Sequence, residues 1–326
     1  MKKIIVTKNE AGTSLIKLLN KHLKNASNGF LYKMLRKKNI TLNDKKASGN
    51  EKVAIDDVIT LFFSDETYNK FTGTTQDTLP EGYETIQKLC NENAYAKLPI
   101  IYETDDMVFF NKPAGMLSQK AQKNDISANE LFLAYLLSKG ELTPDRYRTA
   151  KPSVCNRLDR NTSGLLACGK TMKGLQELSF ALKERTIKKY YICLVKGNVV
   201  KSIRVSGYLL KNETTNQVQI YEKPVPDAKR IETAYEPLSY ENGYTLLKVH
   251  LITGRSHQIR AHLAYLGHPI IGDPKYGEAV LNKAVRQKYG LTHQLLHAYQ
   301  MVFEDGTEIF APIPQIFDKI KGARSN

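Results

Sequence analysis

An aspartate lies between two arginines in the segment Asn156-Arg157-Leu158-Asp159-Arg160-Asn161-Thr162-Ser163-Gly164, just before an apolar stretch. Nearby positive charge favours the ionised form of a carboxyl group, so we expect Arg157 and Arg160 to keep Asp159 ionised. An ionised carboxylate at a place that also attracts phosphate can act as a nucleophile or as a general base. On its own, the pattern fits better an ion-paired loop that fixes the start of a strand.

Two other segments favour the chemical interpretation. The segment 185–195 is a basic approach to a strand that opens with Tyr190 and Tyr191. The segment 251–263 contains a strand, a glycine turn and a basic helix start. Positive side chains oppose the dipole at the start of a helix, but an anion bound there makes them tolerable. Taken singly, Tyr191 is more often a core aromatic residue, and Arg260 is more often a charge on a helix surface.

Taken together, the three segments resemble the pseudouridine synthases of the RluA family. The family's aspartate motif, H-R-L-D-x-x-T-S-G-L, is matched by Arg157–Asp159 and Thr162–Leu165. Its tyrosine motif, K-x-Y-x-A-L-V, aligns with Lys189–Val195 and selects Tyr191 over its neighbour. Its arginine motif, T-G-R-T/S-H-Q-I-R-x-H, is matched through Thr253–His262.

Further stretches extend the resemblance from about residue 100 to residue 315. They are Asn111–Gly115, His268–Gly277 and Leu295–Ala298. Asn156 stands where the family usually has His, and Cys193 stands where it usually has Ala. Neither departure removes an expected catalytic group, so we interpret the chain as an active enzyme.

The resemblance implies isomerisation of uridine to pseudouridine within RNA, with neither cofactor nor metal. Asp159 is then the catalytic carboxylate, which either attacks C1′ or removes the 2′ proton; the sequence leaves both open. Tyr191 would stack on the uracil and could remove the C5 proton, while Arg260 would pair with Asp159. Arg157 would fill the stack that the flipped base vacates. The other residues expected to contact the substrate are Arg160, Thr162, Lys189, Arg255, His257 and Gln258.

The charge of the chain independently indicates a polyanionic partner. Its 326 residues contain 48 Lys and Arg against 33 Asp and Glu, a net charge of +15. Such a surplus attracts nucleic acid, and binding through it should weaken as salt rises. An anionic membrane surface is the weaker interpretation, and a basic surface that serves only solubility is the third.

About half of this surplus lies in residues 1–62, which hold 13 Lys and Arg and 5 Asp and Glu. Leucines at helical spacing predict one helix from Leu15 and a second from Leu31, with short strands at 39–42 and 58–62. This pattern resembles the S4 RNA-binding domain; a basic helical cap without a ligand is the alternative. The basic residues expected to bind RNA there are Lys33, Arg36, Lys37 and Lys38.

We expect an α+β protein in which a mostly antiparallel mixed sheet forms the catalytic domain. The predicted parts are an S4-like α+β domain at 1–62, a linker with one short helix at 63–95 and the catalytic domain at 96–326. The strands are expected at 107–110, 165–168, 190–195, 218–221, 244–251 and 299–303. The helices are expected at 127–138, 172–184 and 257–266.

The RNA target implied by the resemblance is ribosomal RNA of the large subunit, with tRNA as the alternative. A non-catalytic RNA-binding factor of ribosome assembly is a hypothesis from another class. A carboxylate-based glycosidase is disfavoured, since Asp159 has no second acid around it. No apolar run is long enough to span a bilayer, and the N-terminus lacks a signal-peptide pattern. We therefore expect a soluble, cytoplasmic protein, with a monomer as the default.

Overall fold

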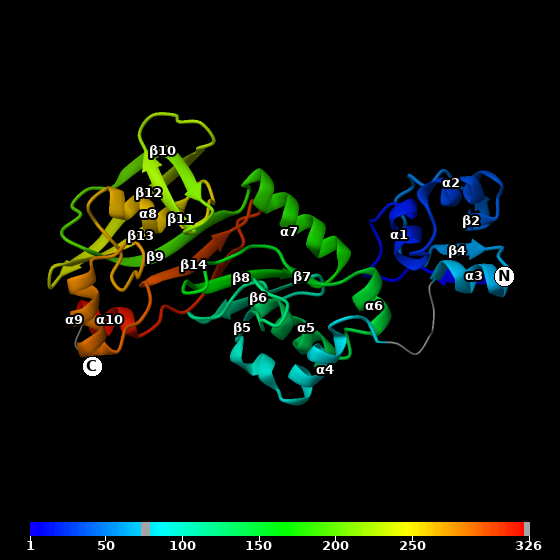
Figure 1. Ribbon diagram of the computed structural model, residues 1–326, viewed down its shortest axis with the longest axis horizontal. Helices are drawn as coiled ribbons and strands as arrows, with labels where there is room; N and C mark the ends of the chain where they lie inside the picture. The colour runs from blue at the N-terminus through cyan, green and yellow to red at the C-terminus, as the bar shows by residue number, and fades with distance from the viewer. Residues whose placement is uncertain (73–78, 323–326) are drawn as a thin grey trace.

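The computed structural model describes residues 1–72 and 79–322, so the part of the predicted linker at 73–78 lies outside the described residues. The molecule is elongated, with a small N-terminal unit at one end and a large sheet in the remainder (Figure 1). The N-terminal unit comprises β1 (Lys2–Ile5), α1 (Leu15–His22), α2 (Asn28–Arg36), β2 (Ile40–Leu42), β3 (Lys45–Lys46), β4 (Val58–Leu61) and α3 (Asp65–Thr72).

The N-terminal unit has its own apolar core. Its four strands form an antiparallel sheet in the order β1-β4-β2-β3. Leu15 on α1 and Leu31 on α2 are fully buried and belong to one cluster with Ile59 on β4. The two predicted helices and both predicted strands are therefore present. The leucine spacing of the two helices turns one side of each toward this sheet.

Residues 63–95 differ from the predicted linker with one short helix. Tyr68 and Phe71 on α3 pack against the N-terminal core. Beyond the undescribed residues, α4 (Tyr83–Asn91) buries Tyr83, Ile86 and Leu89 in a core of the large unit. These three residues recur every third position, the spacing of an amphipathic helix face. The segment thus contributes two helices, one to each core.

The large unit is built on a sheet of eleven strands. The main path runs β11-β10-β12-β13-β9-β14-β8-β6-β5, with β15 beside β14 and β7 beside β8. Only β8 and β14 pair in parallel among the described strands, so the predicted α+β fold with a mostly antiparallel mixed sheet is confirmed. The strands are β5 (Ile100–Glu103), β6 (Met107–Lys112), β7 (Ser153–Val154), β8 (Ser163–Gly169), β9 (Lys188–Lys196), β10 (Ile203–Asn212), β11 (Gln217–Tyr221), β12 (Lys229–Glu241), β13 (Tyr244–Leu251), β14 (Leu296–Val302) and β15 (Glu308–Phe310).

Helices cover both faces of this sheet. On one face, Leu178 of α7 and Ile259 of α8 share a core with Tyr191 and Val249 of the sheet. On the other face, α4 and α5 cover one half, and α9 and α10 cover the other (Figure 1). The helices after α4 are η1 (Ala94–Lys97, a 3-10 turn), α5 (Ala128–Ser138), α6 (Pro144–Thr149), α7 (Met172–Glu184), α8 (Gln258–Tyr265), α9 (Ala279–Tyr289) and α10 (Ile316–Lys321).

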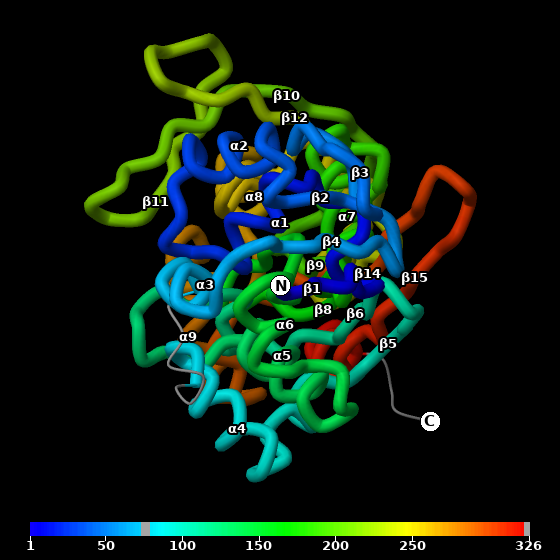
Figure 2. Tube along the Cα trace, turned by 90° about the vertical axis from the view of Figure 1, so that its right-hand side faces the viewer, coloured from blue at the N-terminus to red at the C-terminus, as the bar shows by residue number. Residues whose placement is uncertain are grey.

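α1 of the N-terminal unit contacts α6 of the large unit, and Figure 2 shows the N-terminal unit in front of the large one. The Lys8 ammonium is 2.7 Å from the Asp105 carboxylate, and the Asn9 carbonyl accepts a hydrogen bond from the backbone N–H of Met172. Both of these contacts are polar. None of the helices in the described part of the chain is both long and apolar enough to cross a lipid bilayer.

Candidate active site

Strand register places residues from distant parts of the sequence in one row across the sheet. The row runs from Lys112 on β6 through Gly164 on β8 and Ala298 on β14 to Tyr191 on β9. Directly opposite residues on neighbouring strands lie about 5 Å apart. Lys112 and Tyr191 are thus the two ends of this row, about 15 Å apart along the sheet, with two small residues between them. The segment that carries Asp159 leads into β8 beside this row.

Asp159 is paired with an arginine that lies 101 positions later in the chain. The Arg260 guanidinium donates through Nη1 to Asp159 Oδ2 at 2.8 Å. The Arg260 side chain is only 5% exposed, whereas that of Asp159 is 26% exposed. Oδ1 of Asp159 has no hydrogen-bond partner among the described residues. The predicted contact between Arg260 and Asp159 is present, and it leaves one carboxylate oxygen open.

Arg260 is held from its other side by a second carboxylate. Its Nε and Nη2 donate to the two oxygens of Asp273 at 2.7 and 2.9 Å, a two-point contact that fixes the plane of the guanidinium. The Asp273 side chain is fully buried and also accepts hydrogen bonds from the backbone N–H groups of Lys275 and Tyr276. Burial alone would lower the pKa of Arg260, but Asp273 and Asp159 raise it. Arg260 is therefore a permanently charged bridge between the two carboxylates.

The negative charge of Asp159 affects the ionisation of the Tyr191 phenol. Burial first, and the negative charge of Asp159 second, raise the pKa of the Tyr191 phenol. The residue is 7% exposed, and its hydroxyl has no hydrogen-bond partner among the described residues. The hydroxyl oxygen is nevertheless not fully enclosed by protein, so it still reaches open space. Tyr191 therefore presents a neutral phenol beside the carboxylate.

His257 stands at the edge of the same group. Its Nε2 is 4.0 Å from Asp159 Oδ2, and its Nδ1 is 2.9 Å from the hydroxyl of Tyr276. Burial lowers the pKa of His257, opposed by Asp159 and assisted by Arg260. The ring is thus neutral at neutral pH. His262, five positions on, is buried against Tyr235 and does not reach Asp159.

Lys112 lies buried beneath the loop that carries Asp159. Its ammonium donates to the carbonyls of Pro113, Met116 and Arg160 at 2.8 to 3.1 Å. Burial lowers the pKa of Lys112 to about 7, and Asp159 acts in the opposite direction. A single buried amine therefore ties the loop after β6 to the loop before β8.

Other contacts hold the same loop without touching the carboxylate. The Ser118 hydroxyl both donates to the carbonyl of Leu158 and accepts from its backbone N–H, each at 3.0 Å. Gly164 has φ +109°, and a Cβ there would meet the Ala298 carbonyl oxygen at 2.2 Å. Only glycine permits this close approach of β8 to β14, so the motif's glycine has a structural cause. The Asn156 amide donates to the carbonyl of Leu165 and accepts from the backbone N–H of Ala167. Asn156, which stands in place of the usual His, thus holds this loop against β8.

The two arginines that flank Asp159 do not pair with it. Among the described residues neither Arg157 nor Arg160 forms an ion pair with that carboxylate. Arg157 is exposed, and Nε of Arg160 donates to the carbonyl of Gly115 instead. The expectation that these neighbours hold Asp159 ionised is corrected, because the positive charge comes from Arg260.

The remaining predicted substrate contacts divide into open and buried side chains. Arg255 is exposed and Lys189 is half-buried near Gly254. Thr162 is buried and accepts a hydrogen bond from the Gln294 amide. Gln258 is buried as well, with both ends of its amide bonded to the protein around Thr253 and Thr233.

The sequence of the chain is similar to known RNA-modifying enzymes. Residues 106–265 match the family described as RNA pseudouridylate synthase. A ribosomal large subunit pseudouridine synthase C from Vibrio parahaemolyticus is 30% identical over 316 residues, which cover 95% of this chain and 92% of the relative. An uncharacterised RNA pseudouridine synthase from Mycoplasma genitalium is 31% identical over 83% of this chain and 80% of its own length.

This chain belongs to the RNA pseudouridylate synthase family. It is an RNA pseudouridine synthase, an isomerase. The fold agrees with that of human RNA pseudouridylate synthase domain containing 4, with a TM-score of 0.56, 19% identity, and coverage of 72% of this chain and 95% of that one. Human RNA pseudouridylate synthase domain containing 1 gives a TM-score of 0.54 at 22% identity, over 70% and 88% of the two chains.

Sequence reasoning gave no role to three residues of the synthase that the structure brings to the site. Lys112, Asp273 and His297 all fall in stretches that match the family. His297 is fully buried, lies 2.9 Å from the Ser163 hydroxyl through Nδ1, and has its pKa lowered to about 4 by burial. A charged or polar residue inside an apolar strand, as Lys112 and His297 are, was the available indication of a buried polar contact.

The buried amine makes the stability of the synthase depend on pH. The pKa of Lys112 falls from 10.5 to about 7 in the folded chain. Between these values the unfolded chain holds a proton that the folded chain has released, so this group makes the free energy of unfolding rise with pH. Below about pH 7 both states are protonated and the contribution is flat. We expect Lys112→Met to reduce the rise between pH 7 and pH 9, measured by urea unfolding, by about 2 kcal/mol.

The matched control is Lys88→Met, which removes an exposed lysine on α4. It should keep the pH dependence of the unaltered synthase. An equal rise in the free energy of unfolding for Lys112→Met and Lys88→Met would contradict the buried, proton-releasing amine.

Proposed function

We propose that this synthase converts specific uridines of ribosomal large-subunit RNA to pseudouridine, with Asp159 as the catalytic carboxylate. One observation carries the catalytic assignment: Arg260 pins Asp159 Oδ2 at 2.8 Å and leaves Oδ1 without a partner among the described residues. The charge of Asp159 also reaches the Tyr191 phenol, whose pKa it helps to raise. The RNA target is supported by the relatives from Vibrio and Pasteurella, whose names specify the large ribosomal subunit. The net charge of +15 fits a polyanionic substrate.

The reaction breaks the C1′–N1 bond, turns the uracil over and forms a C1′–C5 bond; C5 then loses its proton, and N1 takes up a proton. A carboxylate with one oxygen pinned has a fixed direction of approach, so its free Oδ1 can meet either C1′ or the 2′ proton. Both routes use the same geometry and stay open. The uridine must leave its stack to reach this carboxylate. We propose that Arg157, which is exposed, occupies the space that it vacates.

For Tyr191 we propose stacking or edge contact with the uracil. Its raised pKa keeps the phenol protonated in the resting enzyme, which opposes a resting phenolate as the base that removes the C5 proton. A neutral ring beside a charged carboxylate instead gives the uracil an apolar surface on which to turn. The presence of the hydroxyl then matters less than that of the ring.

The remaining residues divide by accessibility. We propose substrate contacts for Arg160, Lys189, Arg255 and His257, whose side chains are exposed or half-buried; among them, His257 lies 4.0 Å from Asp159 Oδ2. For Thr162 and Gln258 we propose a positioning role in place of direct contact, because their polar groups are buried and already bonded. Thr162 supports the loop of Asp159, and Gln258 supports the start of the helix that carries Arg260.

For residues 1–62 we propose an RNA-binding domain of the S4-like kind. Lys33, Arg36, Lys37 and Lys38 are exposed on α2 and its exit. Because α3 packs on the same core, we extend this domain to Thr72 and begin the catalytic domain at α4. We propose that the synthase works in the cytoplasm, with a monomer as its default state.

Asp159→Asn tests the catalytic assignment. The variant keeps the size of the side chain and removes the charge, so we expect pseudouridine formation in a large-subunit rRNA transcript to fall at least about a thousand-fold. RNA affinity should stay within about two-fold, because one charge among many is lost. Carbodiimide primer extension reads the modification, and filter binding reads the affinity.

The control is Asp44→Asn, an exposed aspartate in the N-terminal unit, which should leave turnover unchanged. Robust turnover by Asp159→Asn would overturn the assignment. Modification of a tRNA transcript in place of rRNA would overturn the proposed target and leave the catalytic residue intact.

Neutralising the basic exit of α2 tests the N-terminal domain. Replacing Lys33, Arg36, Lys37 and Lys38 by Gln together removes four positive charges from an exposed surface. Each phosphate contact to single-stranded RNA contributes about 0.7 to the slope of log K against log salt. We therefore expect weaker rRNA binding and a slope smaller by about 1 to 3 in a filter-binding titration. An unchanged slope would contradict RNA binding by this surface.

A further inference from the structure

The face of the sheet opposite Tyr191 carries a pocket of about 320 Å³ that the catalytic assignment does not use. Strand register again forms a row, from Arg204 on β10 through Ala234 on β12 and His250 on β13 to Tyr190 on β9. Tyr190 is adjacent to Tyr191 in a strand, so the two rings point to opposite faces. The pocket and the candidate active site thus lie back to back at the same level of β9.

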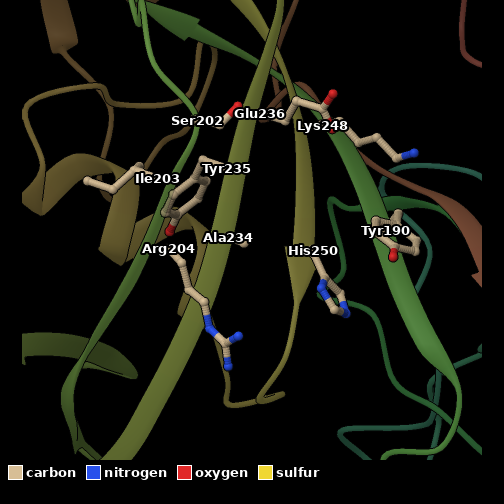
Figure 3. A pocket seen from close by; sticks show the side chains of 9 residues that line it. All are labelled: Tyr190, Ser202, Ile203, Arg204, Ala234, Tyr235, Glu236, Lys248 and His250. Carbon is tan, nitrogen blue, oxygen red and sulfur yellow. The ribbon is translucent and has the colours of Figure 1, made fainter.

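Planar side chains form the two walls of this pocket. The rings of His250 and Tyr190 are stacked, with centroids 4.7 Å apart and planes 26° apart, and Lys248 Nζ is 4.7 Å from the Tyr190 centroid. On the opposite wall, Nε of Arg204 donates to Glu232 at 2.6 Å, which fixes the orientation of its guanidinium. Figure 3 shows the Arg204 and His250 side chains on either side of Ala234.

Ala234 is the floor between these walls. Arg204 and His250 belong to strands separated by one intervening strand, so their backbones lie about 10 Å apart. A methyl group in the middle leaves this gap open above the sheet. The pocket volume falls at the lower end of the range of about 300 to 1,000 Å³ that holds small ligands. A flat group stacked between an imidazole and a guanidinium fits this shape.

The charge around the pocket favours an anion-bearing ligand. Besides burial, four positive neighbours lower the pKa of His250, so its ring is neutral; they are Lys188, Arg204, Lys189 and Lys248. Two acids oppose them: Glu232 pairs with Arg204, and Glu236 stands across from Lys248. The net charge around the pocket remains positive on the side of Lys188 and Lys189.

We infer that this pocket is a second RNA-binding site, which stacks one unpaired base of the substrate between His250 and Arg204. Base stacking on aromatic side chains within a basic groove is the general mode of single-strand recognition. The inference rests on the RNA substrate of the proposed function and adds a site on the opposite face. Lys188 and Lys189 at the start of β9 point to opposite faces of the sheet and supply contacts for the intervening phosphates.

Ala234→Ile tests the pocket by filling its floor. Ile is favoured in strands and removes no charge, so the fold and the electrostatic attraction remain. Stacking is worth about 1–3 kcal/mol per base, so we expect the full chain to bind a single-stranded uridine dodecamer about 5- to 100-fold more weakly. Fluorescence anisotropy measures the affinity. Ala234→Ser, which keeps the floor small, is the matched control and should bind as the unaltered chain does.

An abasic dodecamer of the same length separates stacking from charge. The unaltered synthase should prefer the uridine strand, and Ala234→Ile should lose most of that preference while binding the abasic strand as before. An unchanged preference in Ala234→Ile, or an equal loss for both strands, would overturn the base site and leave only a charged patch.

Turnover on the rRNA transcript distinguishes a failure of the pocket hypothesis from a failure of the proposed function. Ala234→Ile should raise KM and leave kcat within about two-fold, because it lies on the face away from Asp159. An unaltered synthase that modifies no rRNA uridine would overturn the proposed target, while the dodecamer titration would still test the pocket. A fall in kcat with unchanged KM would contradict a binding role for the pocket.

Discussion

The site depends on one buried guanidinium shared by two carboxylates. Arg260 is almost completely removed from water, and such a charge is stable only when opposite charges meet it with good geometry. Asp273 meets it with two oxygens and is itself held by two backbone N–H groups. The third nitrogen of the guanidinium, Nη1, donates to Asp159 Oδ2. The position of Asp159, the proposed catalytic carboxylate, is therefore fixed from a part of the chain more than a hundred residues away.

The sheet supplies the second constraint. Its one parallel pair among the described strands, β8 with β14, brings the loop before β8 next to Tyr191 on β9. That pair requires glycine at 164, since the backbone of Ala298 occupies the space of a side chain. Lys112 then ties the loop from below through three carbonyls. The result is a polar group embedded in an apolar sheet, with every buried charge bonded.

Much of this arrangement could be predicted from the sequence, because the family motifs carry it. The order of the motifs pointed to Asp159, Tyr191 and Arg260, and the apolar runs located most of the central strands. The charge balance around Asp159 could not be read in the same way. Its neighbours in the sequence, Arg157 and Arg160, form no ion pair with it among the described residues, and Arg160 donates to the Gly115 carbonyl instead. Tertiary packing brings in Arg260.

The elements that escaped prediction have physical reasons too. β10 and β12 expose much of their length and alternate polar with apolar residues, so no continuous apolar run marks them. α4 lies in the segment predicted as a linker with one short helix, although three of its residues reach a core of the large unit. Asp273 lies in a matched stretch, but no feature of the sequence around it distinguishes it from other aspartates. Its importance arises only when its partner Arg260 is seen.

The claim that Asp273 acts through Arg260 on Asp159 is tested most directly by a double-mutant cycle on the single-turnover rate of pseudouridine formation. Asp273→Asn alone should slow the reaction about 10- to 100-fold, since the guanidinium loses half of its support while the backbone contacts to the side-chain oxygen can persist. In an Arg260→Gln background the same substitution should change the rate less than about two-fold. Thermal unfolding checks that each protein is folded at the assay temperature. An equal slowing in both backgrounds would contradict the account, because Asp273 would then act independently of Arg260.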